Sequence, residues 1–203
     1  ARPSRCQASA GAASTTATAI DAVMRELARW RRQPELRTVR SFHDDEGWLD
    51  ALVQRIRGQW AHDGPPDRLL MSFHGVPKRT TLAGDPYHEE CLASAAQLAA
   101  RLGLPQDRWM AAFQSRFGRA EWLQPYTAQT LSELGRAGLR RVDVVCPGFV
   151  SDCLETLEEI AIEGKETFVE SGGRDFRFVP CLNDSPAFIE ALGRLALRHL
   201  SGW

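Results

Sequence analysis

Short apolar segments alternate along this chain with longer stretches of helical periodicity, and this alternation constrains the fold more than any other feature. The apolar segments are typical of buried strands and lie at residues 68–73, 109–114, 141–146 and 175–180. The helical patterns lie at residues 44–60, 87–102, 127–137, 152–170 and 186–200. Strands that alternate with helices form a parallel sheet, because each helix returns the chain to the same end of the sheet. We therefore expect an α/β fold, with a parallel Rossmann-like sheet and helices on both of its faces.

The first third of the chain has a weaker pattern. A helix is predicted at about 16–32 and ends before Pro34, and the residues from Leu36 to Phe42 predict a further strand. Residues 64–66 (Gly-Pro-Pro) then form a strong break. Residues 1–20 contain two arginines and no acid, a composition similar to that of a transit peptide. A chain whose start lies inside a longer protein explains that composition equally well.

Composition excludes several classes of function. The 203 residues carry 25 Lys and Arg against 26 Asp and Glu, and no basic run is long enough to indicate a nucleic-acid partner. No apolar run approaches the ~20 residues that a membrane-spanning helix requires. The five cysteines are odd in number and are never spaced C-x-x-C, so they indicate neither a disulfide framework nor a zinc site. We expect reduced thiols in a cytosolic protein.

In a parallel sheet the carboxyl ends of all strands meet at one edge, and ligands bind there. This rule brings together four segments that are distant in sequence, namely residues 73–75, 114–116, 147–149 and 182–184. His74 is the residue among them best suited to chemistry, since an imidazole can accept a proton near neutral pH or bind a metal. On position alone, a histidine that merely caps the strand is an equally good interpretation.

The helix expected at 152–170 carries glutamates at helical spacing, Glu155, Glu159, Glu163 and Glu166. At about 100° per residue they fall within a stripe roughly 80° wide. Such a column is either a solvated face or a track for cations, because carboxylate oxygens bind hard divalent ions, and periodicity alone favours the solvated face. Glu155 differs from the others because it lies at the ligand edge, where it could share a proton or a metal with His74.

The segment 114–118 brings further side chains to the same edge. Arg116 can hold an anionic group, and Trp122, a few residues later, can stack on a planar ring. In isolation, an ordinary packed loop is the simpler interpretation. Cys146 and Cys153 flank the edge, but neither lies in a recognisable nucleophile motif, so nucleophilic catalysis is not indicated.

Taken together, these segments resemble the motifs of one enzyme family, the ferrochelatases. Residues 72–77 (Ser-Phe-His-Gly-Val-Pro) resemble the family's histidine motif, residues 114–118 and 122–125 its second motif, and residues 146–159 its signature segment. Residues 14–18 and 181–184 match as well, so the resemblance runs from about residue 14 to residue 200. The closest likeness is to bacterial ferrochelatases of the protoporphyrin type.

This resemblance implies insertion of ferrous iron into protoporphyrin IX, the reaction that forms haem, by a fold of two chelatase-type lobes that hold the porphyrin between them. His74 and Glu155 would be the catalytic pair, since two pyrrole protons must leave as the cation enters. The metal would be bound by His74, Glu155, Glu159 and Glu163, which replaces the solvated-face interpretation for the last two. The residues that border the porphyrin would be Gln114, Ser115, Arg116, Trp122 and Phe149.

The resemblance also implies an organisation and a set of partners. Residues 1–13 do not resemble the family and are expected to form a disordered tail, residues 14–66 a remnant of an N-terminal lobe, and residues 67–203 the C-terminal lobe. Porphyrin and ferrous iron are expected as substrates, with no resident cofactor and no iron–sulfur cluster. We expect a bacterial, cytoplasmic monomer or homodimer with peripheral membrane contact and no nucleic-acid partner. Two alternatives stay open: an inactive fragment that binds metal or porphyrin weakly, and a related chelatase for another tetrapyrrole or metal.

Overall fold

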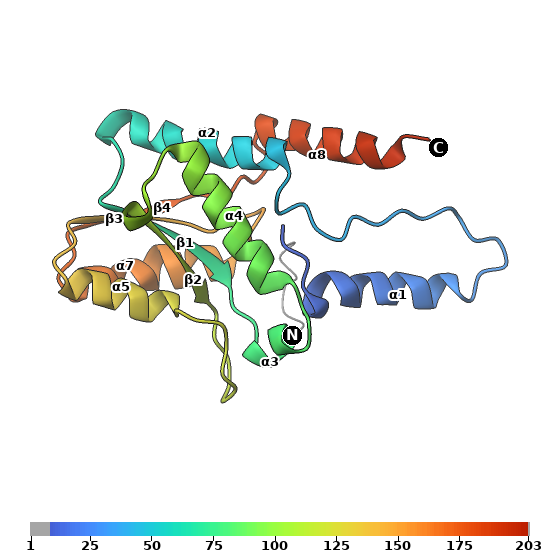
Figure 1. Cartoon of the computed structure of the whole chain (residues 1–203), viewed down its shortest axis with the longest axis horizontal. Helices are drawn as coiled ribbons and strands as arrows, with labels where there is room; N and C mark the ends of the chain where they lie inside the picture. Colours follow the sequence, from blue (N-terminus) through green and yellow to red (C-terminus); the bar gives the residue numbers. More distant parts are fainter. Residues whose placement is uncertain (1–8, 203) are drawn as a thin grey trace.

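The computed structural model describes residues 9–202 and has the expected parallel sheet at its centre (Figure 1). The strands are β1 (Arg68–His74), β2 (Trp109–Gln114), β3 (Arg141–Val145) and β4 (Asp175–Val179). They pair in the order β2-β1-β3-β4, and every pair is parallel. The α/β prediction is confirmed, and each of these strands lies within one residue of its predicted range.

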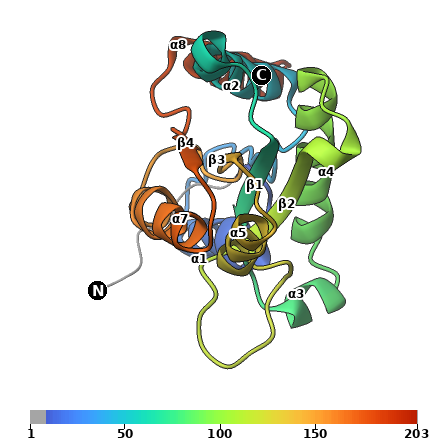
Figure 2. The same cartoon turned by 90° about the vertical axis from the view of Figure 1, so that its left-hand side faces the viewer.

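Helices cover both faces of this sheet (Figure 2). One face carries α2 (Glu46–Asp63), α4 (Tyr87–Leu102) and α8 (Pro186–Leu200), and the other carries α5 (Thr127–Arg136) and α7 (Lys165–Glu170). Side chains alternate across β1, so Leu69 and Met71 join the apolar core under the first group while Leu70 joins the core under the second. Because both faces of the sheet are apolar, both require a layer of helices.

Shorter elements connect these layers. They are a π-helical turn at Ala13–Ala17, α1 (Thr18–Leu27), α3 (Lys78–Leu82), a 3-10 turn at Gln106–Arg108, α6 (Leu154–Leu157) and a π-helical segment at Glu159–Gly164. Within the described residues, no helix combines the length and the apolarity that crossing a membrane demands.

The single helix predicted at 152–170 is therefore three consecutive elements, α6, the π-helical segment and α7. A π-helix has more residues per turn than an α-helix, so it rotates the residues after it relative to those before it. Glu159 is half-buried, whereas Glu163 and Glu166 are exposed. The uniform 100° spacing on which the glutamate stripe was based does not hold across this segment.

Local signals set the ends of the long helices. Asp45 caps α2, because its carboxylate accepts a hydrogen bond from Trp48 N at 3.0 Å. Gly103 ends α4 in the left-handed conformation, with φ of 72°, which glycine adopts without steric cost. Pro186 opens α8, where its missing N–H costs no helical hydrogen bond. These signals were readable in the sequence, so α4 and α8 begin and end where predicted.

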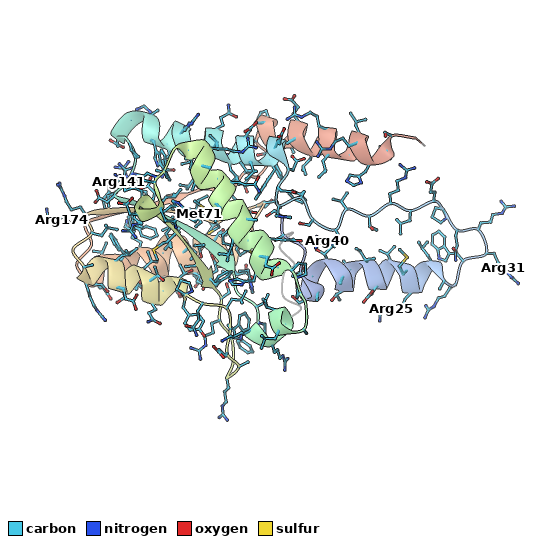
Figure 3. The ribbon with its side chains drawn as sticks, viewed as in Figure 1. Arg25, Arg31, Arg40, Met71, Arg141 and Arg174 are labelled. Atoms are coloured by element: carbon cyan, nitrogen blue, oxygen red, sulfur yellow. The ribbon has the colours of Figure 1, made fainter. Side chains whose placement is uncertain are left out.

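Residues 18–42 form an arm that extends away from the sheet and returns to it (Figure 1). Figure 3 shows Arg25 and Arg31 on this arm, far from Met71 in the sheet. The strand predicted from Leu36 to Phe42 is wrong: no strand of residues 9–202 lies beside this segment, and a strand needs a neighbour for its backbone hydrogen bonds. The helix predicted at 16–32 ends earlier, at Leu27.

The segment before the arm belongs in part to the core. Ser9, Ala10 and Ala12 are buried, and Ser9 Oγ donates to the Pro147 carbonyl at 3.3 Å. The first eight residues of the expected tail, with Arg2, Arg5 and Cys6, lie outside the described residues.

The base of the arm is fastened to α4 by the buried carboxylate of Glu90. Glu90 accepts hydrogen bonds from Gly11 N and Ser41 Oγ, each at 2.8 Å, and pairs with Arg40 at 2.5 Å. Burial by itself raises the pKa of Glu90, but these hydrogen bonds and the charge of nearby His43 lower the pKa below its ordinary value. The folded state therefore favours the ionised form of this carboxyl.

Replacing Glu90 with glutamine is expected to destabilise the protein at neutral pH by about 1–3 kcal/mol, because a charge-assisted hydrogen-bond acceptor is lost. A carboxyl whose pKa falls on folding stabilises the protein above its unfolded pKa, near 4.5, and that contribution is lost as the pH falls through the lower folded value. Urea unfolding should thus show a difference between wild type and Glu90→Gln that shrinks in acid. The exposed neighbour Glu89 supplies the control, Glu89→Gln, and equal losses for the two variants would contradict this prediction.

Candidate functional site

β1 ends on His74, which lies at the carboxyl edge of the sheet as expected. Its Nδ1 is 2.6 Å from the carbonyl oxygen of Gly75, so in the neutral ring Nδ1 carries the proton and Nε2 carries the lone pair. Tyr87 Oη donates a hydrogen bond to the His74 carbonyl at 2.8 Å. These contacts hold the residue in place and make Nε2 the basic atom of the ring.

Two aromatic side chains flank the His74 ring. The centroid of Trp122 lies 6.3 Å away at 42°, and that of Phe149 lies 6.2 Å away at 44°. Trp122 is half-buried and Phe149 is buried. The Trp122 loop is fastened to the turn after His74, since Leu123 N donates to the Val76 carbonyl at 3.0 Å. Three rings from three separate turns thus meet at one edge of the sheet.

Gly75 is needed where these turns approach each other. A Cβ atom at Gly75 would lie 2.8 Å from the Gln114 carbonyl oxygen and 3.0 Å from Cε3 of Trp122. The Gln114 oxygen cannot move away freely, because it accepts a hydrogen bond from Gly75 N at 2.8 Å. A glycine at this position therefore sets the separation between His74 and Trp122.

Gly75→Ala is expected to displace the Trp122 loop and to cost about 1–3 kcal/mol of unfolding free energy, the usual effect of overpacking. Urea unfolding gives the energy, and the NMR shifts of the His74 ring report the displacement. Gly58→Ala is the matched control, because Gly58 lies within helix α2 and has no atom near the added methyl group. A Gly75→Ala variant as stable as Gly58→Ala, with unchanged His74 shifts, would refute the prediction.

Glu155 occupies the single turn of α6, near His74. Burial by itself raises the pKa of Glu155, but a hydrogen bond from Cys153, another from a backbone amide and the charge of His74 together lower the pKa below its ordinary value. The backbone carbonyl of Glu155 accepts a hydrogen bond from Gln114 Nε2 at 2.5 Å. A carboxylate that is ionised at neutral pH thus lies close to a base, as the sheet-edge argument predicted.

Gln114 and Ser115 hold α6 and the π-helical segment after it against the end of β2. Gln114 is buried, and its Oε1 accepts from Ser72 Oγ at 2.7 Å while its Nε2 reaches α6. Ser115 has a left-handed φ of 63°, and its N and Oγ each donate to the Glu159 carboxylate at 2.6 Å. Glu159 is therefore fixed beside the edge by two short hydrogen bonds.

The other predicted site residues lie further out. Glu163 is exposed, and the exposed Arg116 places its guanidinium 5.1 Å from the Tyr126 ring centroid. Within residues 9–202, no group of three or more His, Cys, Asp or Glu side chains is arranged to hold a metal ion. The structure thus brings His74, Glu155, Trp122 and Phe149 together, places Glu159 beside them and leaves Glu163 and Arg116 at the surface.

Three buried thiols of the protein are poor nucleophiles. Among the described residues, Cys91, Cys146, Cys153 and Cys181 form no disulfide. Burial raises the pKa of Cys91, Cys146 and Cys181, so each of the three is neutral at physiological pH.

Sequence reasoning missed the residues that support this site. Tyr87 is 2% exposed and bonds to the His74 backbone, yet nothing in its sequence position distinguishes it from an ordinary core residue. Ser72 did offer a signal, as a polar residue inside an apolar strand. Its Oγ lies 2.8 Å from Thr127 Oγ1, in a buried network that includes Gln114.

Comparison with known proteins places these residues in a family context. The model of the family described as Ferrochelatase matches residues 6–200. The ferrochelatase of Chromobacterium violaceum is 56% identical over 192 residues, which is 95% of this chain and 53% of the relative. The ferrochelatase of Nitrosomonas europaea is 55% identical over the same shares of the two chains. This chain therefore spans about half the length of the curated relatives that it matches.

Two solved structures share the fold. SirB from Bacillus subtilis, solved with Fe3+, has a TM-score of 0.63 at 14% identity, over 95% of this chain and 69% of SirB. CbiX, described as the terminal enzyme of sirohaem biosynthesis in denitrifying bacteria, has a TM-score of 0.57 at 17% identity, over 89% of this chain and 69% of CbiX. At such low identity the likeness establishes the chelatase-type α/β fold alone.

Proposed function

This chain belongs to the ferrochelatase family, and from that membership we propose that it inserts ferrous iron into protoporphyrin IX to form haem. The observation that carries the proposal is the grouping of His74 with Glu155, Trp122 and Phe149 at one edge of the sheet. A base, a carboxylate and two apolar rings are the groups that a flat macrocycle needs when it exchanges protons for a cation.

The proposed reaction balances in charge, because two pyrrole protons leave as one divalent cation enters. His74 Nε2 supplies a proton acceptor, and the Glu155 carboxylate supplies an anionic oxygen for a proton or for the incoming iron. Glu159 is the next carboxylate along the metal's route, and the exposed Glu163 is its outermost member. His74, Glu155, Glu159 and Glu163 are accordingly the proposed metal-binding residues.

The porphyrin is proposed to lie against Trp122 and Phe149. Arg116, an exposed cation on the adjoining loop, is suited to one of its carboxylate substituents. Gln114 and Ser115 border the macrocycle in this proposal. Their hydrogen bonds to Glu155 and Glu159 support a role in positioning these two carboxylates.

The remaining features of the proposal follow from the family. They are the division into residues 14–66 of an N-terminal lobe and 67–203 of a C-terminal lobe, a cytoplasmic location with peripheral membrane contact, and a monomer or homodimer. We propose no resident cofactor and no iron–sulfur cluster, with iron and porphyrin as substrates only.

Anaerobic incubation of the purified chain with ferrous iron and protoporphyrin IX tests the proposal. Haem absorbance should rise above that of a protein-free blank, and the Chromobacterium violaceum ferrochelatase serves as the positive control. If only that relative makes haem, the proposed activity of this chain is wrong, and porphyrin fluorescence quenching would show whether it still binds the macrocycle. Preferential insertion of cobalt or nickel into a less hydrophobic tetrapyrrole would instead indicate a related chelatase.

A further inference from the structure

We propose that Asn183 and Asp152 form a positioning pair that holds Glu155 and Phe149 in the site, a role that rests on the proposed function. The Asn183 side chain is bonded both to the side chain and to the backbone of Asp152. Asn183 Nδ2 donates to Asp152 Oδ2 at 2.8 Å, and Asn183 Oδ1 accepts from Asp152 N at 2.9 Å. A pair of opposed hydrogen bonds, one of them to a carboxylate, fixes distance and orientation together.

Asp152 extends this link in two further directions. Its Oδ1 accepts from Cys181 N at 3.1 Å, just beyond β4. The same oxygen lies 3.3 Å from Thr156 Oγ1, in α6, whose hydroxyl also reaches the Cys153 carbonyl at 3.1 Å. Thr156 is buried, and its Oγ1 also accepts from Cys153 N at 2.9 Å. One carboxylate thus links the loop after β4 to Thr156, the residue that follows Glu155.

Asn183 contributes through its backbone as well. Its φ is 50°, a left-handed conformation that asparagine tolerates better than most residues. In that conformation Asn183 N donates to the Val150 carbonyl at 2.9 Å, directly after Phe149. Asn183 therefore forms hydrogen bonds with the segment 149–152 at two residues, Val150 and Asp152.

The position of Glu155 depends on such contacts because α6 is too short to be stable by itself. α6 has only 4 residues and continues into a π-helical segment, so few regular helical hydrogen bonds stabilise it. Gln114 secures the turn from the β2 side, through the Glu155 carbonyl. The Asp152–Asn183 pair secures it from the β4 side. Neither side chain needs to touch a substrate, so both are positioning residues.

Exchanging the two side chains gives a direct test. Asn183→Asp places two carboxylates opposite each other, so the bond from Asn183 Nδ2 to Asp152 Oδ2 is replaced by repulsion. Asp152→Asn places two amide groups opposite each other and removes the carboxylate acceptor. The double exchange restores the bonds between the two positions: Asn at 152 donates to Asp at 183 and still accepts from Cys181 N, while Asp at 183 accepts from the amide of residue 152. It does not restore the hydrogen bond that Asn183 Nδ2 donates to the Cys181 carbonyl at 3.2 Å, so part of the loss should persist. Each single variant should lower the kcat of iron insertion about tenfold to hundredfold, as loss of support around a metal ligand usually does, with the KM for porphyrin nearly unchanged. The double variant should recover most of that loss.

Amide hydrogen exchange at residues 152 and 181 supplies a readout that does not depend on turnover. Protection should fall in each single variant and return in the double variant, whereas the exposed neighbour variant Asp184→Asn should change neither protection nor kcat. A wild-type chain without turnover would remove the proposed function, and the exchange data would then judge the pair alone. A double variant no better than the worse single variant, or an Asn183→Asp variant with wild-type kcat and protection, would overturn the inference.

Discussion

His74→Ala is expected to lower the kcat of iron insertion by about 10²–10⁴-fold, the usual contribution of a positioned general base. In the folded protein, Nδ1 of His74 is occupied by the Gly75 carbonyl, which leaves Nε2 as the proton acceptor beside Trp122 and Phe149. Removing the ring removes that acceptor. The measurement is the initial rate of haem formation under anaerobic conditions.

His62→Ala is the matched control, because His62 is an exposed histidine in the last turn of α2, away from the sheet edge. It should retain the wild-type rate. Added imidazole should restore part of the activity of His74→Ala and none to a variant that has merely lost its fold. A His74→Ala variant that forms haem at the His62→Ala rate would refute the catalytic role of this histidine.

The largest stability loss is expected for Asp143→Ala, at about 3–5 kcal/mol, because it breaks an ion pair whose carboxylate is fully buried. Asp143 is fully buried in β3, where Arg141 Nε lies 3.0 Å from one carboxylate oxygen and Trp60 Nε1 donates to the other at 2.8 Å. Alanine would remove this acceptor from both donors, and Arg141 would keep only its contacts with Asp175 and with the Asp63 carbonyl. Urea unfolding, followed by circular dichroism, measures the change.

Asp175→Ala tests whether burial is the cause. Asp175 lies 3.7 Å from the same Arg141 but is 44% exposed, so its removal should cost less than about 1 kcal/mol. Replacing Arg141 and Asp143 together by apolar residues should recover much of the loss, since a well-packed apolar pair can match a buried ion pair. Similar losses for Asp143→Ala and Asp175→Ala would contradict this interpretation.

Much of the fold was predictable because its signals are local. β1 to β4 appear where apolar runs predicted strands, and α4 ends at Gly103, where the glycine signal placed its cap. The prediction of a strand at 36–42 was wrong for a non-local reason, because a strand forms only where another strand lies beside it. The π-helical segment after Glu159 was equally unpredictable, because a change in helical pitch leaves no mark in residue spacing.

The sequence alone determined that a parallel sheet would gather His74, Gln114, Phe149 and Asn183 at one edge, because the direction of the chain follows from alternating strands and helices. The tertiary structure decided what each residue does there. It made Nε2 the basic atom of His74, lowered the pKa of Glu155 and turned Gln114 inward as a brace. It also joined Asp152 to Asn183. Hydrogen bonds and pKa values depend on distances of a few ångströms between segments far apart in sequence, and only packing sets those distances.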